Sequence, residues 1–306
     1  MRAIARAISF LETDPWSPDC LVLLKTLYLK SGKSRVIGVT GAPGVGKSTL
    51  VDALTRHYRT EDHRVAVLAI DPTSAFTGGA VLGDRIRMQD HAGDTGVFIR
   101  SMATRGHLGG LAPSVPEALI VLDAGGYETI LIETVGVGQD EIEIAYTAET
   151  RIVVLSPDMG DDVQTMKAGI MEIADIFVLN KCDREGSNAA ASSLQSLLQV
   201  SGQSKRWPRR LVQTVATKDQ GTKELIDCIE EHQSWRKQSQ HSREAQTQTL
   251  KYRLFELLQL RLRGLIDADL EEDYLVPLLK DLQSRQTDPY TVVDRIVSQF
   301  RRSRND

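Results

Sequence analysis

The nine residues GAPGVGKST, from Gly41 to Thr49, have the types and the spacing needed to hold a chain of phosphate groups. They fit the pattern G-x-x-x-x-G-K-S, and they lie between an apolar run, RVIGVT, and a helix-like stretch, LVDALTRHYR. A strand before and a helix after are the context in which this pattern binds phosphate. The sequence therefore predicts a site for a nucleoside triphosphate or its diphosphate.

Each position of this loop has a chemical reason. Glycine can adopt backbone angles closed to other residues, so successive N–H groups can converge on phosphate oxygens at the positive end of the following helix. Lys47 would add a full charge at the outer phosphates, which makes it a catalytic candidate, and the Ser48 hydroxyl would reach Mg²⁺. The expected nucleotide-binding residues here are Gly41, Gly44, Val45, Gly46, Lys47, Ser48 and Thr49.

A second motif, Asn180-Lys181-Cys182-Asp183, ends the apolar run DIFVLN, at the edge of a sheet where α/β folds bind ligands. The Asp183 carboxylate can accept hydrogen bonds from the N1–H and the exocyclic amine of guanine, a donor pair that adenine lacks. An unpaired buried carboxylate costs about 1 to 3 kcal/mol or more, enough for roughly tenfold to hundredfold discrimination. Lys181 would lie along the base or the phosphate loop, and Asn180 would tie the loops together. The two motifs together predict GTP rather than ATP.

Acidic residues stand at or near the ends of other apolar runs: Asp71 after RVAVLAI, Asp84 in GGAVLGDRIRM and Glu133 after TILI. Mg²⁺ prefers oxygen ligands and keeps several waters, so carboxylates beside a triphosphate are expected. We expect these three acids and Ser48 to form the metal site, some of them through water. A helix cap or a turn is the alternative role for any one acid.

Seven short β-branched runs recur along the chain, and they position these motifs: RVIGVT, RVAVLAI, GVFIR, TILIET, RIVVLS, DIFVLN and RLVQTV. They are continuously apolar rather than alternating, which is typical of parallel strands covered on both faces. The sequence therefore predicts an α/β fold of the P-loop NTPase type, with a doubly wound, mostly parallel sheet. This domain is expected over residues 33–232, after an N-terminal helical extension at residues 1–32.

Residues 233–306 differ in character. The stretch QSWRKQSQHSREAQTQT is polar, which indicates a linker or a solvated helix start. Beyond it, apolar residues recur at i, i+3, i+4 spacing in three stretches, and Asp288-Pro289 suits the start of the last helix. These stripes either pack on the parent domain or form a self-association arm. They are Leu250, Leu254, Leu257 and Leu258; Leu275, Leu278, Leu279 and Leu282; Val293, Ile296, Val297 and Phe300.

Composition excludes several other classes. A chain of 306 residues with 41% hydrophobic residues can bury a full core, and a net charge of −4 without a clustered basic face argues against nucleic-acid binding. Cys20, Cys182 and Cys228 are far apart, which fits reduced thiols. The stretch CLVLLKTLYL is too short to span a bilayer, and RAIARAISFLET is no secretory signal. We expect a cytoplasmic protein with neither nucleic-acid nor membrane partners.

Five stretches together resemble the MeaB family, the GTPase chaperones of adenosylcobalamin-dependent acyl-CoA mutases. They are GAPGVGKST, DPTSAFTGGAVLGDRIRM, FIRSMATRGHLGGLA, ETVGVGQDE and VQTMKAGIMEIADIFVLNKCD. The resemblance implies a homodimer joined by the C-terminal helical arm, which favours self-association for the apolar stripes. It also implies slow GTP hydrolysis that a mutase stimulates, coupled to loading of intact adenosylcobalamin and release of damaged cofactor. The partner would hold the cobalamin, and the client could act on methylmalonyl-, isobutyryl-, 2-hydroxyisobutyryl- or ethylmalonyl-CoA.

The family's three mobile segments map by direct match onto residues 71–88, 133–141 and 158–173. In the second segment, Gly136 would contact the γ-phosphate through its N–H, and Gln139 is a candidate for positioning the attacking water. Gln139 stands three positions after Gly136 rather than beside it. Lys167 would bring positive charge to the phosphates when the mutase docks, and its alternative is a solvated helix face.

Two stretches depart from the family pattern. SPDMGDDVQTMKAG lacks the small-residue, PGAGDE-like run of other members, which puts the identity of the partner in doubt. Thr214-Val215-Ala216 stands where V-S-A is usual, so a serine hydroxyl is missing, although the Ala216 N–H can still reach guanine O6.

Two rival functions remain to be weighed. A nickel or cobalt metallochaperone GTPase has a similar domain, but it needs a Cys or His cluster, and His107 and the cysteines have no neighbours of ligand type. A kinase of amino-acid transport proteins would need an acceptor site and a phosphotransfer base, and NKCD disfavours ATP.

Overall fold

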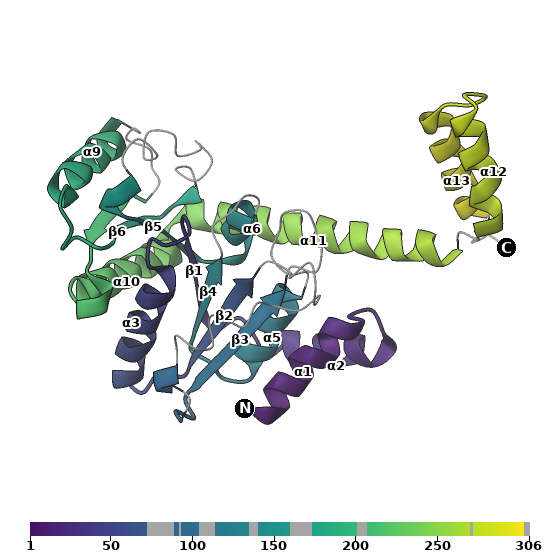
Figure 1. Ribbon diagram of the computed structural model, residues 1–306. Coiled ribbons are helices and arrows are strands. Elements are labelled where there is room, and N and C mark those ends of the chain that lie inside the picture. The colour runs from purple at the N-terminus through teal and green to yellow at the C-terminus, as the bar shows by residue number, and fades with distance from the viewer. Residues whose placement is uncertain are drawn as a thin grey trace. The chain divides into compact units, whose positions relative to one another are not determined.

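The computed structural model describes residues 1–71, 89–91, 93–103, 114–134, 140–159, 173–200, 207–269 and 272–302. By its contacts the chain divides into two compact units, residues 1–246 and 247–306. Figure 1 labels most helices and strands of both units.

The first unit is built on one seven-stranded sheet of order β3-β2-β4-β1-β5-β6-β7. All neighbouring strands run parallel, which confirms the predicted sheet. Strand order reverses at β1, the place where open α/β sheets bind ligands. The strands are β1 (Arg35–Thr40), β2 (Val65–Asp71), β3 (Val97–Ala103), β4 (Thr129–Thr134), β5 (Thr150–Leu155), β6 (Ile176–Leu179) and β7 (Arg210–Gln213).

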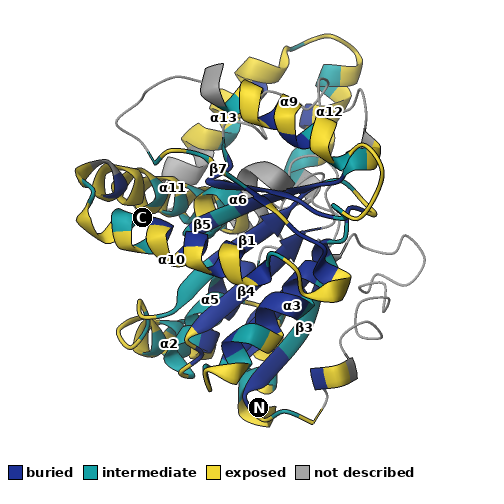
Figure 2. Ribbon diagram, turned by 90° about the vertical axis from the view of Figure 1, so that its left-hand side faces the viewer, coloured by how far each residue is buried: buried dark blue, intermediate teal, exposed yellow. Residues whose placement is uncertain are grey.

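Helices cover both faces of this sheet, as Figures 1 and 2 show. One face packs against α3 (Lys47–Thr60) and α10 (Thr222–Gln238), and the other against α5 (Val115–Ala124), α6 (Asp140–Thr147) and α9 (Ser187–Val200). Strand β6 shows why its sequence is continuously apolar. Ile176 and Val178 enter the core under α3 and α10, whereas Phe177 and Leu179 enter the core under α9.

The N-terminal helices α1 (Arg2–Thr13) and α2 (Pro18–Tyr28) pack over α5. Ile8 and Leu11 of α1 are buried in the same apolar cluster as the strands beneath α5. Arg100 of β3 holds α1 further, since it donates hydrogen bonds to the Ala5 carbonyl oxygen at 3.2 Å and to the Glu12 carboxylate at 2.6 Å. These helices therefore contribute to the core of the first unit.

Three helices follow: α11 (Gln240–Asp269), α12 (Glu272–Gln283) and α13 (Pro289–Arg302). The polar stretch after residue 233 is helical, in α10 and α11, so it is not a flexible linker. Asp288 caps α13 as predicted, because its carboxylate accepts hydrogen bonds from the N–H groups of Tyr290 and Thr291 at 2.9 and 3.0 Å. None of the helices in the described ranges is long and apolar enough to cross a membrane.

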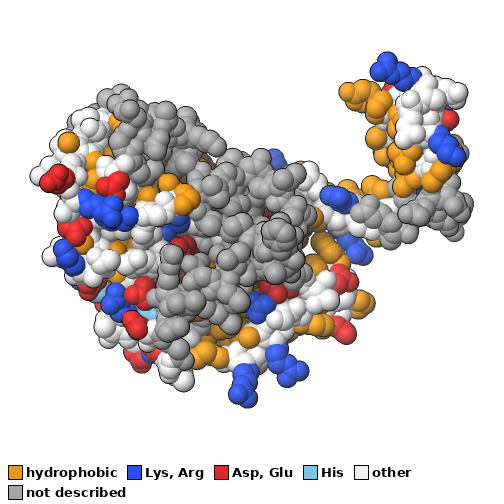
Figure 3. Space-filling view, in the orientation of Figure 1, with side chains coloured by type: hydrophobic (Ala, Val, Ile, Leu, Met, Phe, Trp, Pro, Cys, Tyr) orange, Lys and Arg blue, Asp and Glu red, His pale blue; other side chains and the backbone are white. Residues whose placement is uncertain are grey.

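Part of each predicted apolar stripe is exposed in these helices. Leu254, Leu258 and Leu279 are 66%, 49% and 52% exposed, and Val293 is 56% exposed, whereas Leu278 and Val292 are buried. Figure 3 shows hydrophobic side chains on the surface of α12 and α13. These helices thus carry apolar surface that the second unit does not bury by itself.

Candidate functional site

The loop between β1 and α3 has the backbone geometry of a phosphate cradle. Gly41 and Gly46 adopt φ values of 143° and 99°, a region that favours glycine. A Cβ at Gly41 would lie 2.2 Å from the Val154 carbonyl oxygen, and one at Gly46 would lie 2.3 Å from the Asn180 side-chain nitrogen. The glycines are therefore needed both for the turn and for the close approach of β5 and β6.

Lys47 begins α3 and is only 7% exposed. Its ammonium donates hydrogen bonds to the carbonyl oxygens of Gly41 and Ala42, at 2.8 and 3.0 Å. These contacts hold the positive charge against the loop itself. A bound anion would offer the Lys47 ammonium a full negative charge in place of two carbonyl dipoles. A full charge is the stronger hydrogen-bond partner for a buried cation.

Ser48 and Glu133 meet beside this loop. The Ser48 hydroxyl donates to the Glu133 carboxylate at 2.6 Å, and Glu133 lies at the carboxyl end of β4 with 5% exposure. Hydroxyl and carboxylate oxygens are the donors that Mg²⁺ prefers, so these residues fit the expected ion. Asp71 ends β2, while Asp84 lies outside the described residues.

Next to Glu133, Thr134 donates from its hydroxyl to the hydroxyl of Thr40 at 2.9 Å, and both residues are fully buried. Thr40 directly precedes the phosphate loop, and Thr134 is the second residue of the predicted second mobile segment, residues 133–141. Nothing in the spacing of the two threonines along the chain indicates this contact between the two strand ends. The candidate residues Gly136, Gln139 and Lys167, together with His107, lie outside the described residues.

Asn180, which is 3% exposed, joins three loops. Its side-chain nitrogen donates to the Val45 carbonyl oxygen at 2.9 Å, and its side-chain oxygen accepts from the Thr214 hydroxyl and the Ala216 N–H, both at 3.1 Å. These contacts match the role expected of Asn180, which is to hold the loops together. Thr214, one residue before the position at which relatives have a serine, provides a hydroxyl to this network.

Lys181 and Asp183 of the second motif are more exposed than Asn180. The Lys181 ammonium donates to the Gly44 carbonyl oxygen at 2.6 Å, so this side chain lies along the phosphate loop. Asp183 forms an ion pair with Lys218, with 2.9 Å between Nζ and Oδ2. The Lys218 hydrogen bond lowers the pKa of the Asp183 carboxyl below its usual value. The carboxylate is therefore charged and points to a surface where a ligand can reach it.

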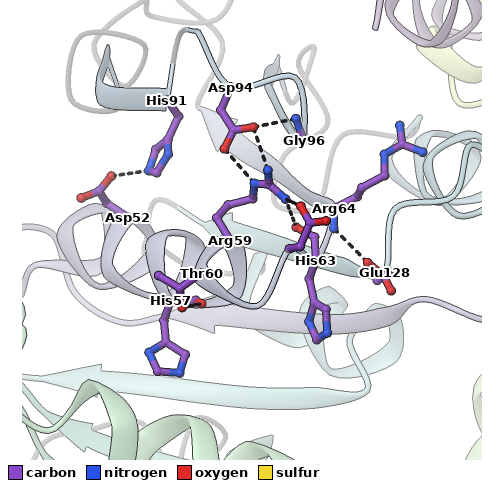
Figure 4. Close-up of polar contacts among 11 residues, drawn as sticks. Asp52, His57, Arg59, Thr60, His63, Arg64, His91, Asp94, Gly96 and Glu128 are labelled. Atoms are coloured by element: carbon purple, nitrogen blue, oxygen red, sulfur yellow. Dashed lines mark hydrogen bonds and ion pairs between the residues drawn. The ribbon is translucent and has the colours of Figure 1, made fainter.

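The outer side of α3 anchors His91 and Asp94, which follow the first predicted mobile segment (Figure 4). A His91 ring nitrogen lies 2.9 Å from the Asp52 carboxylate. Arg59 binds both carboxylate oxygens of Asp94, at 2.7 and 3.0 Å, and Asp94 also accepts from the Gly96 N–H. Since α3 begins in the phosphate loop, the same helix carries the loop and this anchor.

No group of three or more His, Cys, Asp or Glu side chains that could hold a metal occurs among the residues that the structure describes. Cys20 and Cys228 are buried, and burial raises the pKa of the Cys228 thiol to about 11. These two thiols are thus poor metal ligands where they lie.

Comparison with known proteins agrees with this site. A family profile described as "Methylmalonyl Co-A mutase-associated GTPase MeaB" matches residues 4–268. A relative from Pyrococcus abyssi that carries a GTPase name is 44% identical over 302 residues, which are 98% of this chain and 93% of the relative. The mitochondrial methylmalonic aciduria type A homolog of Mus musculus is 36% identical over 201 residues, 64% of this chain and 48% of the relative.

A solved structure described as an LAO/AO transport system kinase superposes with a TM-score of 0.70 and 24% identity, covering 97% of this chain and 92% of that one. At this identity the likeness shows the fold alone. Together, the parallel sheet, the glycine loop and the named relatives define a P-loop GTPase, which binds GTP and GDP. The chain belongs to the MeaB family, the GTPases associated with methylmalonyl-CoA mutase.

Proposed function

We propose that this GTPase is a chaperone for an adenosylcobalamin-dependent acyl-CoA mutase, and that it gates loading, protection and reactivation of the cofactor. The observation that carries the proposal is the family match over residues 4–268, in a family described by its association with methylmalonyl-CoA mutase. The client is methylmalonyl-CoA mutase or a close relative, such as 2-hydroxyisobutyryl-CoA or isobutyryl-CoA mutase. The partner holds the cobalamin.

In this proposal, the phosphate loop holds the triphosphate through Lys47 and the N–H groups from Gly41 to Thr49. Asp183 and the Ala216 N–H bind guanine, and Asn180 and Lys181 hold the base loop against the phosphate loop. The described contacts of Asn180 and Lys181 with Val45 and Gly44 support this arrangement. Ser48 and Glu133 would hold Mg²⁺, with Asp71 and Asp84 acting directly or through water. The ion would neutralise charge on the phosphates.

Hydrolysis depends on segments that the γ-phosphate orders. Gly136 senses this phosphate, Gln139 orients the attacking water, and Lys167 adds charge when the mutase docks. The cycle is driven by the different affinity of the mutase for the GTP and GDP states, since a ligand shifts an equilibrium only through such a difference.

The exposed apolar residues of α11 to α13 support a homodimer. A leucine in α11 such as Leu254, 66% exposed, would gain from burial against a second copy. We expect Leu254→Glu to lower the molar mass measured by light scattering to that of one chain. Thr249→Glu, which adds the same charge to α11 without removing a leucine, is the control. A dimer that persists in Leu254→Glu and Leu258→Glu alike would contradict this part of the proposal.

The decisive experiment measures phosphate release from GTP by the protein alone and with each candidate acyl-CoA mutase. A large stimulation by one mutase would support the chaperone role and identify the client. Stimulation should be lost with Lys47→Ala and kept with Lys25→Ala, which removes an exposed lysine from α2. Failure of every mutase to stimulate would contradict the proposal.

A second measurement separates the rival kinase function. If radiolabel from the γ-phosphate of GTP is released as free phosphate, hydrolysis is the reaction. Label that stays on a protein would overturn the chaperone function in favour of a kinase.

A further inference from the structure

A lysine outside the predicted nucleotide motifs contacts the residue expected to recognise the base. Lys218 ends η3 (Ala216–Lys218), the turn after the Thr214-Val215-Ala216 loop. Its ammonium lies 2.9 Å from Oδ2 of Asp183, although the two residues are 35 positions apart in sequence. The pair therefore depends on the fold and not on local sequence.

The backbone on both sides of this pair is fixed by hydrogen bonds. Cys182 N–H donates to the Thr214 carbonyl oxygen at 3.1 Å, and Lys218 N–H donates to the Val215 carbonyl oxygen at 2.9 Å. Val215 and Gln220 form an isolated antiparallel bridge, which closes the turn that contains Lys218. These hydrogen bonds fix the distance between the backbone at Asp183 and the backbone at Lys218. The ion pair between the two side chains therefore opens by rotation of the side chains.

Both side chains have room for that rotation. The Lys218 side chain is 57% exposed and that of Asp183 is 39% exposed, so water can replace either partner. Neighbouring cations are engaged elsewhere: Lys181 with the Gly44 carbonyl oxygen and Arg184 with Asp158. Among the described residues, Lys218 is the cation that contacts the Asp183 carboxylate.

We propose that Lys218 is a specificity-determining residue that occupies the Asp183 carboxylate in the nucleotide-free protein and is displaced by guanine. The inference rests on the proposed contact between Asp183 and guanine. A carboxylate that accepts from both the N1–H and the exocyclic amine uses both oxygens, and the Lys218 ammonium holds one of them. Guanine association therefore competes with an internal ion pair, whereas a base without both donors cannot replace it.

The test replaces Lys218 with methionine, which keeps the length of the side chain and removes its charge. Binding of GDP is measured by stopped-flow fluorescence and calorimetry at low and high ionic strength. We expect Lys218→Met to bind GDP up to about fivefold more tightly at low salt, mainly through faster association, since exposed ion pairs are weak. The gain should shrink as salt rises, because salt screens the wild-type pair. Lys218→Arg should stay close to wild type.

Lys223→Met is the matched control, because it removes the same charge from an exposed pair with Asp227 on α10. It should not tighten GDP binding. If Lys218→Met binds GDP no more tightly than Lys223→Met does, the inference is wrong, and Lys218 either keeps its place or contacts the bound nucleotide.

Asp183→Asn separates this inference from the proposed function. It should weaken GTP and favour xanthosine triphosphate, whose C2 carbonyl can accept from the asparagine amide, and adding Lys218→Met should then have no effect. If Asp183→Asn keeps wild-type GTP affinity, the proposed base contact itself is wrong. If Asp183→Asn changes preference while Lys218→Met brings no gain, only the role of Lys218 is wrong.

Discussion

Two buried polar clusters lie at opposite ends of the strands β5 and β6. The carboxyl-end cluster contains Lys47, Asn180 and Thr214 beside the phosphate loop. The amino-end cluster contains Thr150, Arg151, Asp175, Trp207 and His232. Both clusters combine residue types that occur in catalytic and binding sites, but the polar atoms of the two clusters have different contacts.

In the amino-end cluster, residues of β5 and α10 contact Asp175, which directly precedes β6, and Trp207, which lies before β7. Arg151 donates to both oxygens of Asp175 at 2.7 and 2.8 Å, and the Trp207 indole N–H donates to the Asp175 carbonyl oxygen at 3.2 Å. A His232 nitrogen lies 3.0 Å from the Thr150 hydroxyl, and Trp207 packs edge-on against the His232 ring. The cluster is a closed set of contacts that joins β5, β6 and α10.

This difference shows how residue types alone can mislead. Thr150, His232 and Asp175 are the types found in a nucleophile, base and acid triad. Yet Thr150 is 0% exposed and His232 is 1% exposed, so no substrate can reach them. At the carboxyl end, by contrast, Lys47 contacts main-chain carbonyl oxygens in a glycine loop at the point where strand order reverses. The first cluster stabilises the fold, and the second is placed to bind a ligand.

The largest expected effect comes from Lys47→Ala. Removing one partner of a buried charged contact costs about 2 to 5 kcal/mol, so GTP and GDP affinity should fall by roughly a hundredfold or more. Calorimetric titration measures the loss, and Lys25→Ala is the control. Thermal unfolding without nucleotide should change little. If the affinity for GTP and GDP did not change, Lys47 would not bind the nucleotide, and the carboxyl-end cluster could no longer be distinguished from the amino-end cluster as a ligand site.

Asp175→Ala should give an effect of similar size on a different quantity. It leaves the Arg151 guanidinium without its carboxylate, and breaking such a buried pair costs about 3 to 5 kcal/mol of unfolding free energy. Urea unfolding measures this loss. The folded fraction should bind GDP as wild type does. A selective loss of GDP affinity would show that the amino-end cluster also acts on the site.

The buried histidine makes the stability of the amino-end cluster depend on pH. Burial lowers the pKa of His232 from its ordinary value of 6.5 to about 4; Asp175 opposes this shift, and Arg236 and Arg151 add to it. As pH falls through this window, the unfolded chain binds the proton first. The histidine's contribution to the unfolding free energy is therefore full above pH 6.5, and about 3 kcal/mol is lost by pH 4.

Other groups also titrate in that window, so the variant His232→Asn is needed. We expect the loss of unfolding free energy between pH 7 and 4 to be smaller in His232→Asn than in wild type by about that 3 kcal/mol. Equal slopes for His232→Asn and wild type would mean that His232 is not held neutral.

The sequence predicted those parts of the molecule that local pattern determines. Continuous apolar runs such as DIFVLN predict a strand covered on both faces, and Phe177 and Val178 indeed lie in cores on opposite faces of the sheet. The phosphate loop was predictable because its glycines, Lys47 and Ser48 are neighbours in sequence. Asp288 and Pro289 marked the start of α13 for the same reason.

Other contacts depend on loops that only the fold brings together. Nothing in the spacing indicates that Lys218 reaches Asp183 or that Arg100 of β3 holds the carbonyl oxygen of Ala5. The substitution in the base loop was expected to remove a hydroxyl. Comparing single positions shows only that the serine is absent. The structure shows that Thr214, one residue earlier, donates its hydroxyl to Asn180.

The smallest expected effects come from a matched pair of threonine substitutions, one in each cluster. Thr214→Val and Thr150→Val each remove one buried hydroxyl and keep the shape of the side chain, which costs about 1 kcal/mol of unfolding free energy. Thr214→Val also loosens Asn180, so GDP affinity should fall a few-fold at most, about 1 kcal/mol or less. Thr150→Val should leave GDP affinity unchanged. If both variants lose stability and neither changes affinity, then the Thr214 hydroxyl at Asn180 is as purely structural as the Thr150 hydroxyl at His232. In that case the two clusters differ only in the groups that contact the ligand directly.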